Sequence, residues 1–272
     1  MDIGAYFRRI GYDGPTALTF ETLRDVQRAH ATTIPYETFD IFFGRRITTD
    51  PGAAFRKIVG GGRGGWCYEH NGLLGLALAK LGFGVSRLTA GGDQPATHLA
   101  LRVEVPGAGS YVCDPGFSDA PLDPFPLVDG AFEQNGFAYR VERLGGERFQ
   151  FINHPLGLTP GYIAEAADEV AMARASDWLQ SAPESRFIHV PVVCIHEADG
   201  AVRALAGRTL RTVRPDRIDA LRIESVDEYR EVLKGVFRLD LPAAADLWPE
   251  IVRRQEAYDR QREASAAAAA AS

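Results

Sequence analysis

The spacing of apolar residues along the chain changes from a helical to a strand-like period near residue 84. Before this point, apolar positions recur at helical spacing between capping residues and glycines. Thr19 and the pair Asp50-Pro51 are typical helix starts, and Gly82 is a typical helix end. The pattern predicts three helices here: Phe20 to His30, Pro51 to Val59, and Cys67 to Leu81.

The third of these helices is expected to be buried on all sides. Its apolar residues wrap nearly the whole helix circumference, which is typical of a helix in a protein core. They are Leu73, Leu74, Leu76, Ala77, Leu78 and Leu81.

Beyond residue 84, short runs with a period of two predict strands, and Asp199-Gly200 predicts a hairpin between two of them. The expected strands are Val85 to Leu88, Leu99 to Val105, Tyr111 to Val112, Ala138 to Val141, Arg148 to Ile152, Val190 to His196, Val202 to Ala206 and Thr209 to Val213. Helices return after a capping signal at Ser225, one to about Phe237 and one from Ala243 to Arg262, followed by an alanine-rich tail. Helices first and strands in the middle indicate an α+β protein of two or three subdomains.

Composition excludes several classes of function. The chain has 272 residues, 46% of them apolar, and its 30 basic and 36 acidic residues give a net charge of −6. Without a basic stripe, neither a nucleic acid nor an anionic membrane surface is an expected partner. The longest apolar stretch, Gly72 to Ala79, is far shorter than a bilayer span, and the N-terminus lacks a signal-peptide pattern, so we expect a cytoplasmic protein.

Cys67 is the one cysteine of three whose position favours reactivity. Three cysteines cannot build a disulfide framework. Cys67 begins the predicted buried helix, where free backbone N–H groups and the helix dipole favour a thiolate, and the glycines before it leave room for a reactant. The alternative is an inert buried cysteine, the usual state of this residue.

The glycines before Cys67 also permit a weaker interpretation. Gly60, Gly62 and Gly65 formally match a dinucleotide-binding motif, but a predicted helix precedes them instead of the strand that the motif requires. The Gly-Lys-Ser or Gly-Lys-Thr of a Walker phosphate loop is absent as well.

A thiolate nucleophile needs an imidazole and a group that orients it, and His98 and Asp114 are the candidates. They flank one predicted hairpin. A three-residue connection that pairs Val105 with Gly109 places Asp114 opposite Ala100 and diagonal to His98, within reach of it. A five-residue connection gives the same register, whereas a four-residue one would put the two side chains on opposite faces.

In the favourable register, Cys113 points away from His98 and belongs to the core. Zinc sites are the alternative use of these residue types. Cys67 with His70, and Cys194 with His196, could each supply half of one, but neither has a second close pair in sequence. We therefore expect no metal.

These residues resemble a known family. The segments RGGWCYEHNGLL (63–74), IPYE (34–37), Thr97-His98 and DPGF (114–117) look like the signatures of the arylamine N-acetyltransferases, and residues 2–12 resemble bacterial members. The resemblance implies an N-terminal helical bundle (1–83) carrying the nucleophile, a central β-barrel (84–188) carrying His and Asp, and a C-terminal α/β lid (189–272). It also implies a Cys-His-Asp triad like that of a cysteine protease.

By the same resemblance, Cys67 matches the acetylated nucleophile, His98 the base and Asp114 its orienting acid. The implied reaction is ping-pong transfer of an acetyl group from acetyl-CoA to an arylamine or hydrazine, with acetyl-CoA as co-substrate and no permanently bound cofactor. Phe117 and Tyr36 are candidate acceptor contacts, and Gly116 and Ser118 are candidate CoA contacts.

The sequence departs from the usual family pattern at Thr38, at Pro115 and in a short segment, 91–96. These departures affect the expected approaches of the acceptor and of CoA, and they leave the triad residues unchanged. Three rival functions stay open. One is an amide synthase that releases and cyclises a polyketide chain. Another is a hydrolase of the papain or transglutaminase type, and a third is a non-enzymatic scaffold.

Overall fold

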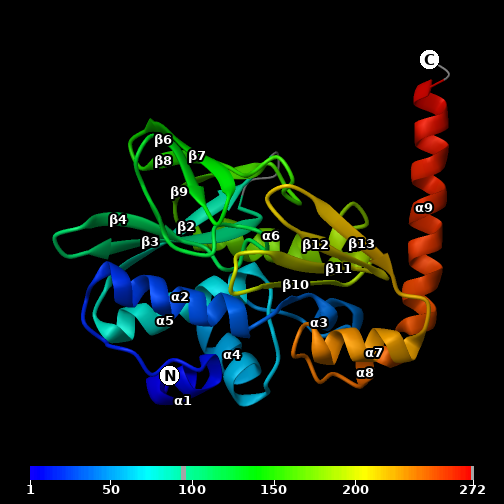
Figure 1. Cartoon of the computed structure of the whole chain (residues 1–272), viewed down its shortest axis with the longest axis horizontal. Helices are drawn as coiled ribbons and strands as arrows, with labels where there is room; N and C mark the ends of the chain where they lie inside the picture. Colours follow the sequence, from blue (N-terminus) through cyan, green and yellow to red (C-terminus); the bar gives the residue numbers. More distant parts are fainter. Residues whose placement is uncertain (93–95, 271–272) are drawn as a thin grey trace.

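The computed structural model describes residues 1–92 and 96–270, and it is an α+β fold with two antiparallel sheets (Figure 1). The first third of the chain is mostly helical. Its elements are α1 (Ile3–Ile10), α2 (Phe20–Thr33), the short strand β1 (Tyr36–Glu37), α3 (Phe39–Phe42), α4 (Pro51–Phe55), the π-helical turn η1 (Arg56–Gly60) and α5 (Cys67–Leu81).

The middle of the chain forms one antiparallel sheet of eight strands in the order β5-β4-β3-β2-β9-β8-β7-β6. No ladder joins β5 to β6 within the described residues, so the expected β-barrel is corrected to an open, curled sheet. Its strands are β2 (Gly84–Gly91), β3 (His98–Val105), β4 (Gly109–Cys113), β5 (Phe125–Pro126), β6 (Gly130–Gln134), β7 (Phe137–Gly145), β8 (Arg148–Ile152) and β9 (Gly161–Ala166).

The second sheet has five strands in the order β1-β10-β11-β12-β13 and joins the two ends of the chain. Tyr36 of β1 pairs with Cys194 of β10, and Thr38 Oγ1 accepts a hydrogen bond of 3.0 Å from the Val192 N–H. The later elements are α6 (Glu169–Ser181), the 3₁₀ turn η2 (Arg186–Ile188), β10 (Val192–His196), β11 (Val202–Ala206), β12 (Thr209–Val213), β13 (Ile218–Arg222), α7 (Val226–Gly235), α8 (Ala243–Asp246) and α9 (Trp248–Ala270). β1 belongs to the predicted helical bundle (1–83) but pairs with β10 of the predicted lid (189–272). The division of the chain at residues 83 and 188 stays a prediction.

Several predicted elements are confirmed, and others need correction. The helix Cys67 to Leu81 and the strands Arg148 to Ile152, Val202 to Ala206 and Thr209 to Val213 have the expected bounds. The helix expected from Ala243 to Arg262 is two helices, because Pro249 is tolerated only in the first turn of α9. The alanine-rich tail continues α9 to Ala270, and in Figure 1 this helix extends away from the body of the molecule.

Helix α5 is the centre of the first core. Leu73, Leu74, Ala77 and Leu78 are all fully buried, and they pack with side chains of α1, α2 and β3. Burial of each leucine stabilises the fold by roughly 1.5–3 kcal/mol. Helix α5 also lies close to the sheet, since a Cβ on Gly75 would come within 3.1 Å of Leu101. The N-terminal end of α5, with Cys67, is therefore held in a fixed position.

No helix in the part of the chain that the structure describes is both long and apolar enough to cross a bilayer.

Two of the glycines before α5, Gly64 and Gly65, are packed closely against neighbouring residues. A helical segment, α4 with η1, precedes them, so the strand required for a dinucleotide site is absent among the described residues. A Cβ on Gly64 would overlap the Pro35 carbonyl oxygen and approach Glu37 Cγ to 2.8 Å. Gly60, by contrast, has nothing within 4 Å of such an atom.

We expect Gly64→Ala to lower the free energy of unfolding by at least about 2 kcal/mol, because the added methyl group must displace backbone. Gly60→Ala is the matched control and should change it by less than about 1 kcal/mol. Urea unfolding of the two variants beside the parent protein measures both values. Equal stability of the two variants would contradict the packing role of Gly64.

Candidate functional site

Cys67 is the first residue of α5, and the start of this helix is fixed by its own sequence. The Glu69 carboxylate accepts a hydrogen bond of 3.2 Å from the Trp66 N–H, so a donor at the helix start is satisfied by a side chain three residues ahead. Cys67 is only 5% exposed. A sulfur at this position lies beside free N–H groups and the positive end of the helix dipole.

A buried ion network anchors the loop that leads to Cys67. Arg63 donates to Glu37 Oε1 at 2.6 Å and to Asp40 at 3.1 Å, while Lys57 Nζ lies 2.8 Å from both Asp40 and Glu69. Burial raises the pKa of Glu69 to about 7, although Lys57 opposes the rise. Arg63 and Glu69 thus hold the loop by hydrogen bonds.

The predicted hairpin register is confirmed. Val105 pairs with Gly109 and Leu101 with Cys113, which places Asp114 next to His98 in space. His98 Nε2 lies 2.9 Å from each carboxylate oxygen of Asp114. Both side chains are buried, His98 to 7% and Asp114 to 1% exposure. The Asp114 carboxylate therefore fixes the ring of His98 from one side.

Asn71 ties this pair to the helix that carries Cys67. Its Nδ2 donates to Asp114 Oδ1 at 2.6 Å and to the Leu99 carbonyl, and its Oδ1 accepts from the Gly116 N–H at 3.0 Å. Since Asn71 is one turn after Cys67 on α5, the amide sets the distance between the helix and the Asp114 turn.

Electrostatics favour a charged His98. Burial alone would lower its pKa, but the Asp114 carboxylate and the neighbouring Cys67 raise it to about 10. His70, three residues after Cys67, shows the opposite behaviour: burial lowers its pKa to about 4. His98 is therefore an imidazolium at neutral pH, whereas His70 is neutral.

Cys67 and His98 open into one cleft of about 520 Å³. Tyr36, Gly116, Phe117 and Ser118 line it, so all four predicted substrate and CoA contacts border the same space. The ring of Phe117 lies edge-on to His98, with the ring centres 5.2 Å apart. Phe117 thus forms a wall directly beside the imidazole.

Gly116 has a packing role as well as a place in the cleft wall. A Cβ at this position would lie 2.9 Å from both Cα and the carbonyl oxygen of Cys67. Pro115 directs the same turn, in which the Phe117 N–H donates to the Asp114 carbonyl at 3.2 Å. The departure from the family pattern at Pro115 therefore coincides with a tight turn against Cys67. The short segment 91–96 includes 93–95, which lie outside the described residues.

The far wall of the cleft was missed by sequence reasoning. It comes from β9 and from the end of α6 with the turn that follows, and includes Tyr162, Trp178, Glu184, Arg186 and Phe187. Tyr162 packs on His98 with ring centres 5.3 Å apart. These segments carry no motif, and only their position after the sheet has curled brings them to Cys67.

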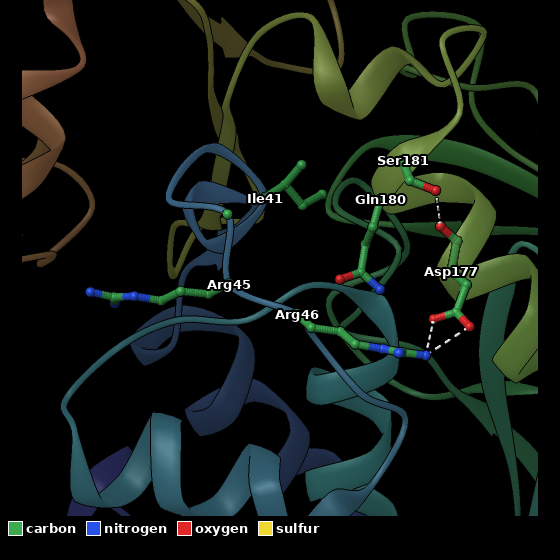
Figure 2. Close-up of a pocket in the computed structure, with 7 residues that line it drawn as sticks. Ile41, Arg45, Arg46, Asp177, Gln180 and Ser181 are labelled. Atoms are coloured by element: carbon green, nitrogen blue, oxygen red, sulfur yellow. Dashed lines mark hydrogen bonds and ion pairs between the residues drawn. The ribbon is translucent and has the colours of Figure 1, made fainter.

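A second, shallower pocket of about 440 Å³ on the other face of α6 shows how this wall is attached (Figure 2). Gln180 exchanges hydrogen bonds with the backbone of Ile47, at 2.7 and 3.0 Å. Arg46 donates to both oxygens of Asp177 at 2.7 and 2.8 Å. Asp177, Gln180 and Ser181 border this pocket, whereas Trp178 and Leu179 border the cleft, so α6 is a partition between the two.

The other two cysteines lack the setting of Cys67. Cys113 packs in the helical core on the face away from His98, as its strand parity predicts, and Cys194 is buried beside Tyr36. Burial raises the pKa of Cys113 well above its usual value and that of Cys194 to about 12. Both thiols are therefore neutral.

The half-sites considered for zinc do not come together. His70 uses its ring nitrogens on His30 and the Pro35 carbonyl, both at 3.0 Å, and His196 Nε2 lies 3.0 Å from the Ala120 carbonyl. In the described part of the chain, no group of three or more His, Cys, Asp or Glu side chains could hold a metal ion.

Comparison with known proteins gives the family. The sequence model of the N-acetyltransferase family matches residues 19–246. An arylamine N-acetyltransferase of Mycolicibacterium smegmatis is 33% identical over 256 residues, which cover 89% of this chain and 93% of that protein. One from Mycobacterium tuberculosis is 31% identical, with 89% and 90% coverage.

Solved structures agree with the sequence comparison. The fold matches a structure of the M. smegmatis arylamine N-acetyltransferase with a TM-score of 0.82 at 32% identity, covering 92% of this chain and 97% of that one. It matches the Mycobacterium marinum arylamine N-acetyltransferase in complex with CoA with a TM-score of 0.81 at 28% identity, covering 93% and 98%. The chain therefore belongs to the arylamine N-acetyltransferase family, whose members are acyltransferases.

Proposed function

We propose that this protein transfers an acetyl group from acetyl-CoA to the nitrogen of an arylamine or arylhydrazine, through a thioester on Cys67. One observation carries the proposal: a cysteine at a buried helix start and an imidazole held charged by a carboxylate border one cleft. This is the arrangement that activates a thiol as a nucleophile.

In the first half-reaction, the Cys67 thiolate attacks the carbonyl carbon of acetyl-CoA and a C–S bond forms. The tetrahedral intermediate then collapses, the bond to the CoA sulfur breaks, and the imidazolium of His98 protonates the leaving thiolate. Because His98 Nε2 is bonded to Asp114, Nδ1 is the nitrogen that faces this chemistry. Backbone N–H groups at Cys67 stabilise the developing oxyanion.

In the second half-reaction, the amine attacks the acetyl-Cys67 carbonyl. The now neutral His98 accepts a proton from the amine nitrogen, and the Cys67 thiolate leaves, which restores the starting ion pair. Asp114 keeps the imidazole oriented and stabilises its charge. Each half-reaction thus returns His98 to the protonation state that the next one needs.

The cleft supports the predicted substrate contacts. Phe117 and Tyr36 offer aromatic surface to an arylamine next to Cys67. The relative from M. marinum binds CoA, which supports acetyl-CoA as the donor. Ser118 lines the cleft and offers a hydroxyl to CoA, while Gly116 lines the cleft and lets the Asp114 turn pack closely against Cys67. Three free cysteines fit a reducing compartment such as the cytoplasm.

Incubation with acetyl-CoA alone should add one acetyl group to the protein, detected by intact mass. Cys67→Ala should abolish the adduct, and Cys113→Ala is the matched control that should keep it. An arylhydrazine should then remove the acetyl group and appear acetylated. An absent adduct on folded protein would contradict the proposal, and removal by water at the same rate would favour the hydrolase.

Asp114→Asn should lower the pKa of His98 well below about 10, because burial is then opposed by the neighbouring Cys67 alone. Acetylation of Cys67 at neutral pH should slow at least about 100-fold, since the imidazole loses the carboxylate that orients it and stabilises its charge. NMR titration of the His98 ring and the initial acetylation rate measure the two effects. Asp227→Asn, on the exposed helix α7, is the control for loss of one carboxylate. A His98 pKa that stays near 10 in Asp114→Asn would contradict this assignment.

A further inference from the structure

Arg186 is a cation on the cleft wall whose position is fixed by its neighbours. It begins the 3₁₀ turn η2 directly after Ser185. The Ser185 hydroxyl donates to the Leu179 carbonyl at 2.6 Å and accepts from the Phe187 N–H at 3.3 Å. These bonds attach the turn to the end of α6, which the Gln180 and Arg46 contacts hold from the other side.

The guanidinium of Arg186 lies on an aromatic support that leads to the nucleophile. It stands 4.9 Å from the ring centre of Phe187, and Phe187 packs edge-on against Trp66 with ring centres 6.1 Å apart. Trp66 immediately precedes Cys67. A guanidinium stacked on a buried ring is oriented before any ligand arrives, which reduces the entropy lost on binding.

The charge of Arg186 is only partly offset by the protein: burial raises the pKa of Asp119 to about 6, and Arg186 acts against that rise from beyond salt-bridge distance. The cations of the nearby network, Lys57 and Arg63, are bonded to carboxylates, whereas no ion pair found among residues 1–92 and 96–270 includes Arg186. Its field nevertheless reaches the cleft wall. Burial raises the pKa of Tyr36 well above its usual value, and Arg186 acts against that rise.

An anion cannot be attracted by the protein as a whole, because the net charge is −6. Glu184, which lines the same cleft, repels anions as well. Binding of an anionic substrate group therefore depends on a local, uncommitted cation with a fixed orientation. Among the lining residues that the structure describes, Arg186 is the one cationic side chain apart from His98.

We propose that Arg186 binds the anionic oxygens of a substrate in this cleft, either a carboxylate on the aromatic acceptor or a phosphate of CoA. A guanidinium presents two parallel N–H groups that match both groups. The inference rests on the proposed acetyl transfer, which gives the two sources separate half-reactions. Arg186 is thus a specificity-determining residue in the half-reaction whose substrate carries the anionic group.

The test measures each half-reaction of Arg186→Gln with a charged reactant and a neutral counterpart. The first uses acetyl-CoA against the acetyl thioester of N-acetylcysteamine, which has no phosphates. The second discharges the acetyl-enzyme with 4-aminobenzoate against 4-aminobenzamide. In one pair, the charged reactant should lose about 10-fold in rate at subsaturating concentration while the neutral one changes less than about 2-fold. That pair identifies the source of the anion.

Three further variants sharpen the result. Arg186→Lys keeps the positive charge but lacks the two parallel N–H groups of the guanidinium. Its rate with the charged reactant should fall less than that of Arg186→Gln. Glu184→Gln removes the negative charge that repels anions. It should raise the rate with the charged reactant relative to the neutral one. Arg211→Gln removes one exposed cation of β12, outside the cleft, and should leave both ratios unchanged.

Two results would overturn the assignment. Unchanged charged-to-neutral ratios in both half-reactions of Arg186→Gln would show that no anion contacts this side chain. Equal losses with charged and neutral reactants would show a structural effect only. An unmodified parent protein after treatment with acetyl-CoA would instead reject the proposed function, and the mass measurement distinguishes that failure from the other two.

Discussion

The structure depends on neutralising charges that are buried around the start of α5. Glu37, Asp40 and Glu69 lie almost out of reach of water, so each must be paired or hydrogen-bonded. Arg63 and Lys57 supply that pairing, and together they connect β1, the loop after it and the first turn of α5. Removing one partner would leave an uncompensated charge, which is strongly destabilising. Cys67 is thus positioned by ion pairs between the side chains of the segments around it.

A second connection joins that helix to the sheet. Asn71 bonds to Asp114, to the Leu99 carbonyl and to the Gly116 N–H, so a single amide fixes the geometry between Cys67 and the His98–Asp114 pair. A side chain of this kind does not contact the substrate. It holds the neighbouring groups in place beforehand, which lowers the entropic cost of reaching the reactive geometry. The cleft wall is held differently: Arg186 and Trp178 are exposed, and their positions are set through α6 and the hydrogen bonds of η2. A buried Cys67–His98 site therefore faces an exposed but oriented substrate surface.

Much of the reaction centre could be predicted from the sequence, because the information is local. The hairpin register follows from the connection between Val105 and Gly109, and the setting of Cys67 from its place at a helix start. The far wall could not be predicted. Trp178 and Arg186 meet Cys67 only because an eight-stranded sheet curls and α6 folds back, and strand order is not encoded in hydrophobic period. The break at Pro249 was a local signal that the prediction overlooked.

The pairing of β1 with β10 has a consequence for biosynthesis. Residues 36–37 join a sheet whose other strands begin at Val192, so one wall of the cleft takes its final place only after most of the chain has left the ribosome. Until then, the apolar surface around Tyr36 and Cys67 is uncovered. Contacts of such long sequence separation slow folding and extend the time during which that surface can associate with other chains. The nascent protein therefore contains Cys67 early and completes the cleft around it late.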